Sequence, residues 1–456
     1  MRRLAPFLVL LAGCGTTRPE TPARPNILFI LADDLGYGDL GCFGNREVRT
    51  PHLDRLAAEG ARLTNFYVTW PACTPSRGSI LTGRYPRRNG LYEMIRNDLV
   101  DQGFRYTEET YATSPEMTLG MDLREVSFAQ VLKSAGYATG VVGKWDGGRA
   151  ERFLPLQRGF DFFYGFANTG IDYWTHERYG IPSMFRGNAR VKEPGYATDL
   201  FRREAVRFMR ERRDGPFALY VAFNAPHGPS NLERTGMQAP DDAVARYPGL
   251  DPTANKTRYL ACVTRLDDAV GELLATLREL GLDRNTLVLL SSDNGGTKVG
   301  SNGPLRGFKG QLFEGGLRVP TIARWPGRVP AGSTRDEVLS ALDLFPTFLG
   351  LAGARAPEGL VLDGVDLMPV LEGKARSPRR DLFWEHSTSR AARVGSLKWI
   401  ETADGSGGLY DLAADVGESR DLSRERPDAL DDLRRRWAAW KQTMDRAEPR
   451  GPFRED

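Results

Sequence analysis

The stretch Asn26-Ile27-Leu28-Phe29-Ile30-Leu31-Ala32, followed at once by Asp33-Asp34, decides the fold class of this chain. The run has the length of a strand, and from Ile27 onward it is apolar at every position rather than at every second one. Such a run fits a strand that is buried on both faces. It therefore predicts a parallel sheet that is covered by helices on both sides.

Three further apolar runs each follow a segment with a helical pattern. They lie at residues 137–142 after 126–134, 217–223 after 199–212, and 286–290 after 258–280. This alternation predicts an α/β fold with a mostly parallel central sheet. Ligand sites in such folds gather at the carboxyl ends of strands. Four groups come just after these runs and are expected to converge on one edge: Asp33-Asp34, Lys144, His227 and Asp293-Asn294.

The last part of the chain has a different pattern. A basic stretch with Pro and Gly at residues 373–380 is followed by short strand-like pieces at 382–385, 392–394 and 397–402 and a Gly-rich turn at 404–408. A closing helix at 427–444 carries Leu430, Leu433, Trp437 and Trp440 at helical spacing, which indicates core packing. We predict a main domain over residues 25–372 and a smaller subdomain of antiparallel sheet plus helix over residues 373–456.

Composition indicates a large globular protein without a strong global charge. Of the 456 residues, 41% are hydrophobic and 27% are charged, which is enough to bury a sizeable core. The formal net charge of +3 is too small to argue for a nucleic-acid partner, and none is expected.

The amino terminus resembles a bacterial export signal. Arg2 and Arg3 precede a short apolar run at residues 4–12, and Leu11-Ala12-Gly13-Cys14 resembles a lipobox. The run is too short to span a bilayer, which takes about 20 apolar residues. We predict a signal peptide at residues 1–13 and a lipidated Cys14 with a polar tether at 14–24. The protein would then be exported and anchored in the cell envelope, in the outer membrane or the periplasm; the alternative is an ordinary cleaved signal.

The cysteines point to one special thiol. Without Cys14, three remain, Cys42, Cys73 and Cys262, and an odd number provides no disulfide framework. Cys73-Thr74-Pro75-Ser76-Arg77 continues to Leu81-Thr82-Gly83-Arg84, and this twelve-residue pattern resembles the signature of the formylglycine-dependent sulfatases. Gly78 and Ser79 are expected to open a helix whose positive end attracts an anion.

The resemblance to sulfatases implies both a fold and a nucleophile. The fold would be like that of alkaline phosphatase. A formylglycine-generating or anaerobic sulfatase-maturating enzyme would oxidise Cys73 to formylglycine (3-oxoalanine), whose hydrated gem-diol attacks sulfur. Arg77 would hydrogen-bond the diol.

The same resemblance implies a metal site and a sulfate site. Asp33, Asp34, Asp293 and Asn294, with the oxidised residue 73, match the family's metal ligands. Hard oxygen donors suit Ca²⁺, or Mg²⁺, and poorly suit Zn²⁺. Lys144, in Gly-Lys-Trp, and Lys309, in Gly-Phe-Lys-Gly, would hold sulfate oxygens, and His227 with Lys309 would protonate the leaving alcohol.

Two places depart from the family pattern or match it loosely. The family commonly reads Gly-Lys-Trp-His where this chain has Asp146. Asp146 is then either the base that drives sulfate release or a side chain that points away, with another group such as His176 in its place. The aromatic segment at residues 171–176 looks like a substrate-lining loop, so Asp172 and His176 are candidate substrate contacts.

The expected activity is hydrolysis of sulfate esters on a carbohydrate, an oligosaccharide or polysaccharide. One alternative is a phosphodiester or phosphonate hydrolase of the same superfamily, which would need more cationic contacts than two lysines and one histidine. The other is a sulfated-glycan-binding homologue without turnover, which would not require the Cys73 motif.

Overall fold

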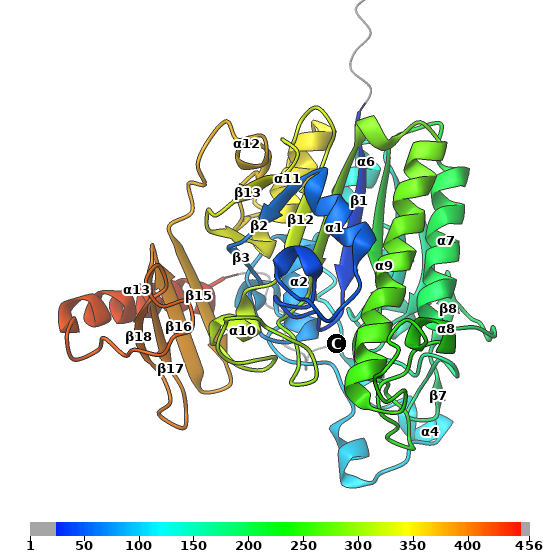
Figure 1. Ribbon diagram of the computed structural model, residues 1–456, viewed down its shortest axis with the longest axis horizontal. Coiled ribbons are helices and arrows are strands. Elements are labelled where there is room, and N and C mark those ends of the chain that lie inside the picture. Colours follow the sequence, from blue (N-terminus) through cyan, green and yellow to red (C-terminus); the bar gives the residue numbers. More distant parts are fainter. Residues whose placement is uncertain (1–23, 448–456) are drawn as a thin grey trace, which may run out of the picture.

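A ten-stranded sheet forms the centre of the molecule in the computed structural model, which describes residues 24–447 (Figure 1). The strand order is β13-β2-β12-β11-β1-β10-β4-β5-β8-β9. Five adjacent strands run parallel: β11 (Thr286–Ser292), β1 (Asn26–Ala32), β10 (Phe217–Ala222), β4 (Ala138–Lys144) and β5 (Phe162–Phe166). The prediction of a mostly parallel central sheet is therefore confirmed.

Antiparallel strands extend both sides of this parallel centre. On one side β12 (Thr321–Arg324) pairs antiparallel with β11 and with β2 (Ala61–Leu63), and β13 (Ser333–Arg335) then joins β2 in parallel. On the other side β8 (Met184–Arg186) and β9 (Ala189–Arg190) pair antiparallel.

Helices cover both faces of the sheet, as Figure 1 shows. One face carries α1 (Pro51–Ala58), α7 (Ala197–Glu211) and α9 (Asn255–Glu279), and the other α2 (Cys73–Thr82), α6 (Phe128–Ser134) and α11 (Leu344–Ala352). Successive side chains of β1 alternate between the two cores: Ile27, Phe29 and Leu31 enter one, and Leu28, Ile30 and Ala32 enter the other. This arrangement explains why the run in β1 is apolar without alternation.

Shorter elements connect these layers. They are β3 (Phe66–Tyr67), β14 (Leu339–Ser340), β6 (Glu177–Arg178), β7 (Ile181–Pro182), α3 (Pro86–Asn89), α4 (Glu108–Tyr111), α5 (Pro115–Thr118), α8 (Asp241–Val244), α10 (Glu314–Leu317) and α12 (Met368–Leu371).

The C-terminal part is an antiparallel sheet with one long helix, as expected. The sheet contains β15 (Asp381–His386), β16 (Ser389–Val394), β17 (Leu397–Glu401) and β18 (Gly408–Asp411), and α13 (Pro427–Asp445) packs on it. Trp437 packs edge-on against Trp399, and Trp440 stacks on Phe383. In Figure 1 this sheet lies beside α10 of the main part.

A buried charge cluster joins the C-terminal sheet to the main part. The Lys398 ammonium on β17 lies 2.8 Å from the Glu314 carboxylate on α10 and 2.9 Å from Glu418, and all three side chains are fully buried. Because the two parts share this cluster, a boundary between residues 372 and 373 stays a prediction.

The structure does not describe the amino-terminal segment of the chain. The expected signal segment, Cys14 and most of the tether fall in residues 1–23, outside the described residues. Within residues 24–447 we find no helix with the length and apolar character needed to cross a membrane.

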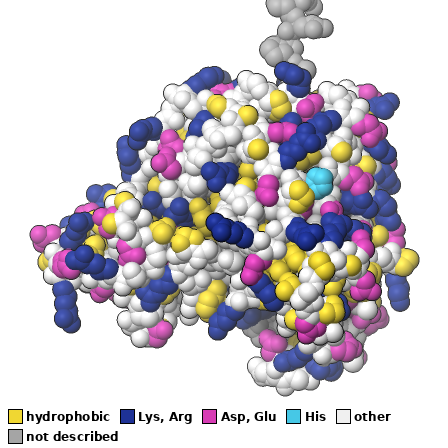
Figure 2. Space-filling view, in the orientation of Figure 1, with side chains coloured by type: hydrophobic (Ala, Val, Ile, Leu, Met, Phe, Trp, Pro, Cys, Tyr) yellow, Lys and Arg dark blue, Asp and Glu magenta, His cyan; other side chains and the backbone are white. Residues whose placement is uncertain are grey.

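Cys42, Cys73 and Cys262 carry free thiols. Figure 2 shows basic and acidic side chains interspersed over one face of the molecule.

Candidate active site

The groups that follow the parallel strands meet at one edge of the sheet. Asp33 follows β1, Lys144 is the last residue of β4, and Asp293 follows β11. The backbone N–H of Asp34 donates to the Asp293 carboxylate at 3.1 Å, and the Lys144 ammonium donates to Asp33 at 2.8 Å. The topology thus brings together residues that are more than one hundred positions apart in the chain.

Backbone conformation at this edge is tightly constrained. Gly143 precedes Lys144 with φ +102°, and a Cβ there would lie 1.9 Å from the Ala222 carbonyl oxygen of β10, so only glycine fits. Asp34 and Asp146 adopt φ values of +65° and +57°, which residues other than glycine rarely do. Such strain is typical of sites where side-chain direction matters for function.

Cys73 is the first residue of helix α2 and is fully buried. The expectation that Gly78 and Ser79 open this helix is wrong, because the helix begins five residues earlier. Pro75 lies in the first turn, where a missing N–H costs no hydrogen bond. The correction puts Cys73 itself, rather than a later residue, at the positive end of the helix.

The Cys73 thiol lies between a carboxylate and an ammonium group. Its Sγ is 3.6 Å from Asp33 Oδ1 and 3.3 Å from the Lys309 Nζ. Burial raises the pKa of the Cys73 thiol well above its usual range, although Lys144 and Lys309 oppose this effect. An unmodified thiol here is neutral at pH 7 and is a poor nucleophile.

Oxygen-rich side chains surround Cys73 and fit a divalent cation. Carboxylate oxygens of Asp33 and Asp34, the Cys73 sulfur and a His227 ring nitrogen lie within 4.8 Å of one another. Asn294 Nδ2 donates to Asp34 at 2.7 Å, while the buried Asn294 Oδ1 has no hydrogen-bond partner. An orphaned buried acceptor beside several carboxylates is what a hard cation such as Ca²⁺ or Mg²⁺ would satisfy.

The carboxylates of this cluster repel one another. Burial raises the pKa of Asp33 to about 7, although the Lys144 ammonium opposes the shift. The negative charges of Asp293 and Asp34 add to the effect of burial. Burial alone would also raise the pKa of Asp293, but Arg77 and the two lysines hold it well below the usual range. A cation placed among three such carboxylates would relieve this repulsion.

Two lysines reach into the cluster, one beside Asp33 and the other beside Asp34. Lys144 is fully buried, and Lys309 contacts both Asp34 oxygens, at 2.6 and 2.8 Å. The Asp33 and Asp34 carboxylates raise the pKa values of Lys144 and Lys309 respectively, against the effect of burial, so both remain cationic. They supply two point charges beside residue 73, as expected for groups that hold a tetrahedral anion.

Arg77 contacts the acidic residues directly. One turn along α2 from Cys73, its guanidinium donates to Asp293 at 2.8 Å and lies 3.6 Å from Asp33. The side chain is completely buried, and Tyr220 Oη lies 3.5 Å from it. In this arrangement Arg77 orients two of the predicted metal ligands.

Asp146 lies beside the helix that carries Cys73. Its Oδ1 accepts a hydrogen bond from Thr74 at 2.9 Å, and its Oδ2 lies 3.7 Å from the Lys144 ammonium. Burial raises the pKa of Asp146, which favours a group that exchanges a proton. Oδ2 is buried without a hydrogen-bond partner.

His227 borders the cluster on the side of Asp34. Its Nε2 is 3.8 Å from the Asp34 carboxylate, and its Nδ1 is 2.6 Å from the Gly228 carbonyl oxygen. Burial lowers the pKa of His227 to about 3, although Asp34 opposes the shift. Nδ1 therefore carries the proton of a neutral ring, and Nε2 faces the cluster.

Asp172 and His176 are not brought into this cluster. The Asp172 carboxylate accepts from the backbone N–H groups of Trp174 and Thr175 and from the side chains of Asn231 and Gln238. The His176 Nε2 faces the Gly195 carbonyl oxygen at 2.9 Å. Asp172 thus ties its own loop to the segment at residues 231–238, His176 ties it to Gly195, and neither residue lines the cavity above Cys73.

A cavity of about 310 Å³ opens above Cys73, His227 and Lys309. Most of its wall consists of residues that were not predicted from the sequence: Glu93, Arg96, Asn97, Asp101, Thr169, Arg178, Tyr179, Ser230 and His386. Most of these residues come from loops, and Arg178 and His386 are the last residues of the short strand β6 and of β15, so no periodic sequence pattern marks the set. His386 is notable because it comes from the C-terminal sheet and packs edge-on against Trp70.

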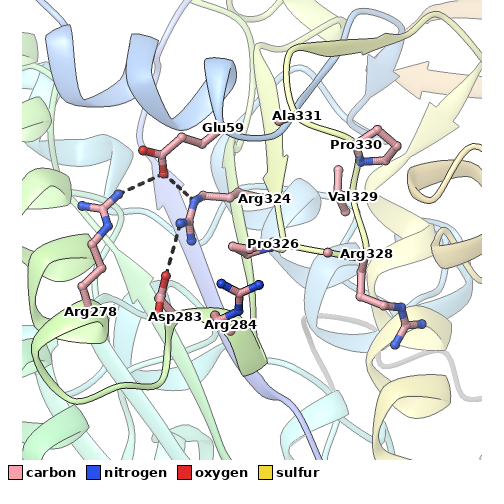
Figure 3. A pocket seen from close by; sticks show the side chains of 11 residues that line it. Glu59, Arg278, Asp283, Arg284, Arg324, Pro326, Arg328, Val329, Pro330 and Ala331 are labelled. Carbon is pink, nitrogen blue, oxygen red and sulfur yellow. Dashed lines mark hydrogen bonds and ion pairs between the residues drawn. The ribbon is translucent and has the colours of Figure 1, made fainter.

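A larger cavity, of about 560 Å³, lies at the opposite edge of the sheet (Figure 3). Its wall includes Arg324, at the end of β12 that lies opposite the beginning of β11. Arg324 and Arg278 both contact Glu59, and Arg324 also contacts Asp283. Arg284 and Arg328 also line this cavity, so its wall is basic, but the wall contains no thiol, hydroxyl or histidine side chain, and the chemistry therefore belongs to the Cys73 cavity.

Comparison with known proteins adds to this geometry. Residues 25–354 match the family model described as Sulfatase, and residues 308–428 match that for the C-terminal part of N-sulphoglucosamine sulphohydrolase. The chain belongs to the sulfatase family. Sulfatases are sulfuric ester hydrolases, and this chain is therefore an enzyme of that class.

Relatives match over most of the chain. N-acetylgalactosamine-6-sulfatase of Canis lupus familiaris is 36% identical over 86% of this chain and 74% of its own length. Human arylsulfatase A is 35% identical over 91% of this chain and 86% of its own length. The crystal structure of Ps i-CgsB in complex with k-i-k-neocarrahexaose superimposes with a TM-score of 0.82 at 31% identity, covering 93% of this chain and 94% of that one.

Proposed function

We propose that this sulfatase hydrolyses sulfate esters on carbohydrates with a formylglycine nucleophile made from Cys73. The observation that carries the proposal is the position of Cys73, at the positive end of α2 between Asp33 and the Lys309 ammonium. A buried neutral thiol there has little use as a nucleophile, whereas an aldehyde hydrate has two hydroxyl groups.

The residues around the diol have separable roles. One hydroxyl group of the residue 73 diol loses its proton to the Asp33 carboxylate, which lies 3.6 Å from the Cys73 sulfur, and its oxygen attacks sulfur as the bond from sulfur to the alcohol oxygen breaks. Lys144 and Lys309 neutralise the sulfate oxygens. Because His227 is neutral with Nε2 unprotonated, this nitrogen takes a proton from the neighbouring Lys309 ammonium and passes it to the departing alcohol. The second hydroxyl then loses its proton to Asp146, which expels sulfate and leaves the aldehyde, and water restores the diol.

Asp33, Asp34, Asp293 and Asn294 would hold a Ca²⁺ ion, or Mg²⁺, beside residue 73. Such an ion lowers the pKa of a bound hydroxyl and neutralises charge on the transferred group. Arg77 keeps Asp293 and Asp33 oriented toward it.

A sulfated carbohydrate is the substrate class that the relatives favour. One is named for N-acetylgalactosamine 6-sulfate, and another was crystallised with a neocarrahexaose. A phosphonate monoester hydrolase also shares the fold, but at 19% identity that likeness concerns the fold alone. With the predicted signal and lipidated Cys14, an exported enzyme would meet polymers at the cell envelope.

The proposal is tested by measuring sulfate release from a panel of sulfated mono- and oligosaccharides. A phosphodiester and a phosphonate ester are assayed in parallel. The protein is produced together with a formylglycine-generating enzyme, and mass spectrometry of the Cys73 peptide reports oxidation. We expect Cys73→Ser to lower turnover at least about 10³-fold. The matched control is Cys262→Ser, because Cys262 is equally buried and its thiol hydrogen-bonds to Tyr196 and Tyr173 in the hydrophobic core. Unoxidised Cys73, or a preference for the phosphorus esters, would overturn the proposal.

A further inference from the structure

A second cavity adjoins the one above Cys73. It has a volume of about 340 Å³, and the two cavities share Gly310 and His386 in their walls. Gly310 directly follows Lys309, which contacts the Cys73 sulfur, and its backbone N–H donates to the Pro71 carbonyl oxygen at 2.8 Å. A ligand held at Lys309 therefore lies next to the entrance of the second cavity.

The second cavity lies between the main part and the C-terminal sheet. The segment from Gly310 to Phe313 forms one wall, and the other consists of the turns that follow β15 and β17. The β15–β16 turn is a two-residue connection in which Ser387 has φ +54°, and the cross-strand pair of His386 and Ser389 closes it. A tight hairpin next to His386 gives this wall a fixed shape.

The chemistry of the second cavity differs from that of the first. Lys309, Arg96 and Arg178 line the first cavity and outnumber its two carboxylates, Glu93 and Asp101, whereas no lysine or arginine lines the second. Five residues with side-chain hydroxyl groups line the second cavity, including Ser389 and Thr402, together with the apolar Leu312 and Phe313.

Its single carboxylate, on the exposed residue Asp404, disfavours anions. The Ser406 and Thr402 hydroxyl groups and the Ser406 N–H hold the pKa of Asp404 at about 2, so this wall residue is negatively charged at neutral pH. Neutral hydroxyl donors together with one carboxylate suit a polyol and repel a sulfate group. Each cavity is at the small end of the range for small-molecule sites, which suits one compact unit in each.

We propose that the second cavity binds an unsulfated sugar unit of a chain whose sulfated unit occupies the cavity above Cys73, with His386 between the two units. The proposal rests on the function proposed above and extends it: the enzyme acts on oligosaccharides or polysaccharides, and its C-terminal sheet provides a subsite. Asp404 then selects against a sulfate group on the neighbouring unit.

Filling the second cavity tests the proposal. Ala403, an exposed turn residue in its wall, is replaced by tryptophan. The matched control is Ala413→Trp, because Ala413 is also exposed but lies beyond Asp411, which pairs with Leu397 at the other end of the same sheet. The substrates are the sulfated monosaccharide that the wild-type enzyme hydrolyses fastest in the panel and a disaccharide that joins it to an unsulfated sugar.

We expect the wild-type enzyme to have a kcat/KM at least about tenfold higher for the disaccharide than for the monosaccharide. Ala403→Trp should remove that advantage and leave the monosaccharide kcat/KM within about twofold, while Ala413→Trp changes neither. Asp404→Asn should improve hydrolysis of a disaccharide with sulfate on both units. Equal kcat/KM for both wild-type substrates, or a disaccharide advantage that survives Ala403→Trp, would overturn the subsite. Absence of sulfate release from every carbohydrate would instead overturn the proposed function.

Discussion

Replacement of Lys398 by methionine should lower the free energy of unfolding by about 3–5 kcal/mol, the cost of removing one partner from a buried ion pair. Lys398 Nζ contacts Glu314 at 2.8 Å and Glu418 at 2.9 Å, with no exposure of any of the three side chains. Methionine is similar in length but carries no charge. The substitution therefore leaves two buried carboxylates with one cation fewer and creates little empty space.

The destabilisation should grow with pH. Burial raises the pKa of Glu418 to about 7, whereas Lys398, Arg393 and Arg318 outweigh burial at Glu314 and lower its pKa to about 2. Loss of Lys398 raises both values. A carboxyl group whose pKa is higher in the folded than in the unfolded protein destabilises the fold once the pH is high enough to ionise it. Without Lys398, both Glu418 and Glu314 are more costly to ionise in the folded protein, so the loss of stability grows as the pH rises. The cost should therefore be smaller at pH 5 than at pH 8.

Urea unfolding at pH 5 and pH 8, followed by tryptophan fluorescence, measures this effect. Lys441→Met is the matched control, because Lys441 pairs with Asp445 on the surface of α13 in the same part of the molecule. A surface pair of this kind contributes at most about 0.5 kcal/mol. The reasoning is refuted if Lys398→Met costs no more than Lys441→Met, or if its cost does not rise between the two pH values.

Three further substitutions probe the site and the fold. Burial raises the pKa of Asp267 to about 7, so the stabilisation that the protonated carboxyl group provides is lost as the pH rises through that value. Asp267→Asn removes this titration, and the free energy of unfolding should therefore fall less steeply from pH 5 to pH 8. Urea midpoints across this range measure it, and an unchanged slope would contradict it. Asn294→Ala should weaken Ca²⁺ affinity at least about tenfold by calorimetry, since it removes an unpaired buried acceptor; unaltered affinity would exclude Asn294 as a ligand. Asp146→Ala should slow turnover and accumulate sulfated enzyme in intact-mass spectra; full turnover without that species would rule out Asp146 as the base.

Sequence alone determined the class of fold and the chemical centre. An apolar run without alternation has one stable environment, a strand with helices on both sides, so β1 and its parallel neighbours followed from residues 26–32 and similar runs. Because parallel strands end at the same edge, the convergence of Asp33, Lys144 and Asp293 followed as well. The Cys73 pattern identified the family because its residues are contiguous.

Only the tertiary structure decided what surrounds that centre. Helix α2 begins at Cys73 itself, and the side chains of Asp172 and His176 bond to neighbouring segments rather than lining the cavity. Arg178 and His386 meet in one wall although they are more than two hundred residues apart. Local periodicity reports which face of an element is buried, but a cavity wall is assembled from loops by the packing of distant elements, and no short-range pattern encodes it.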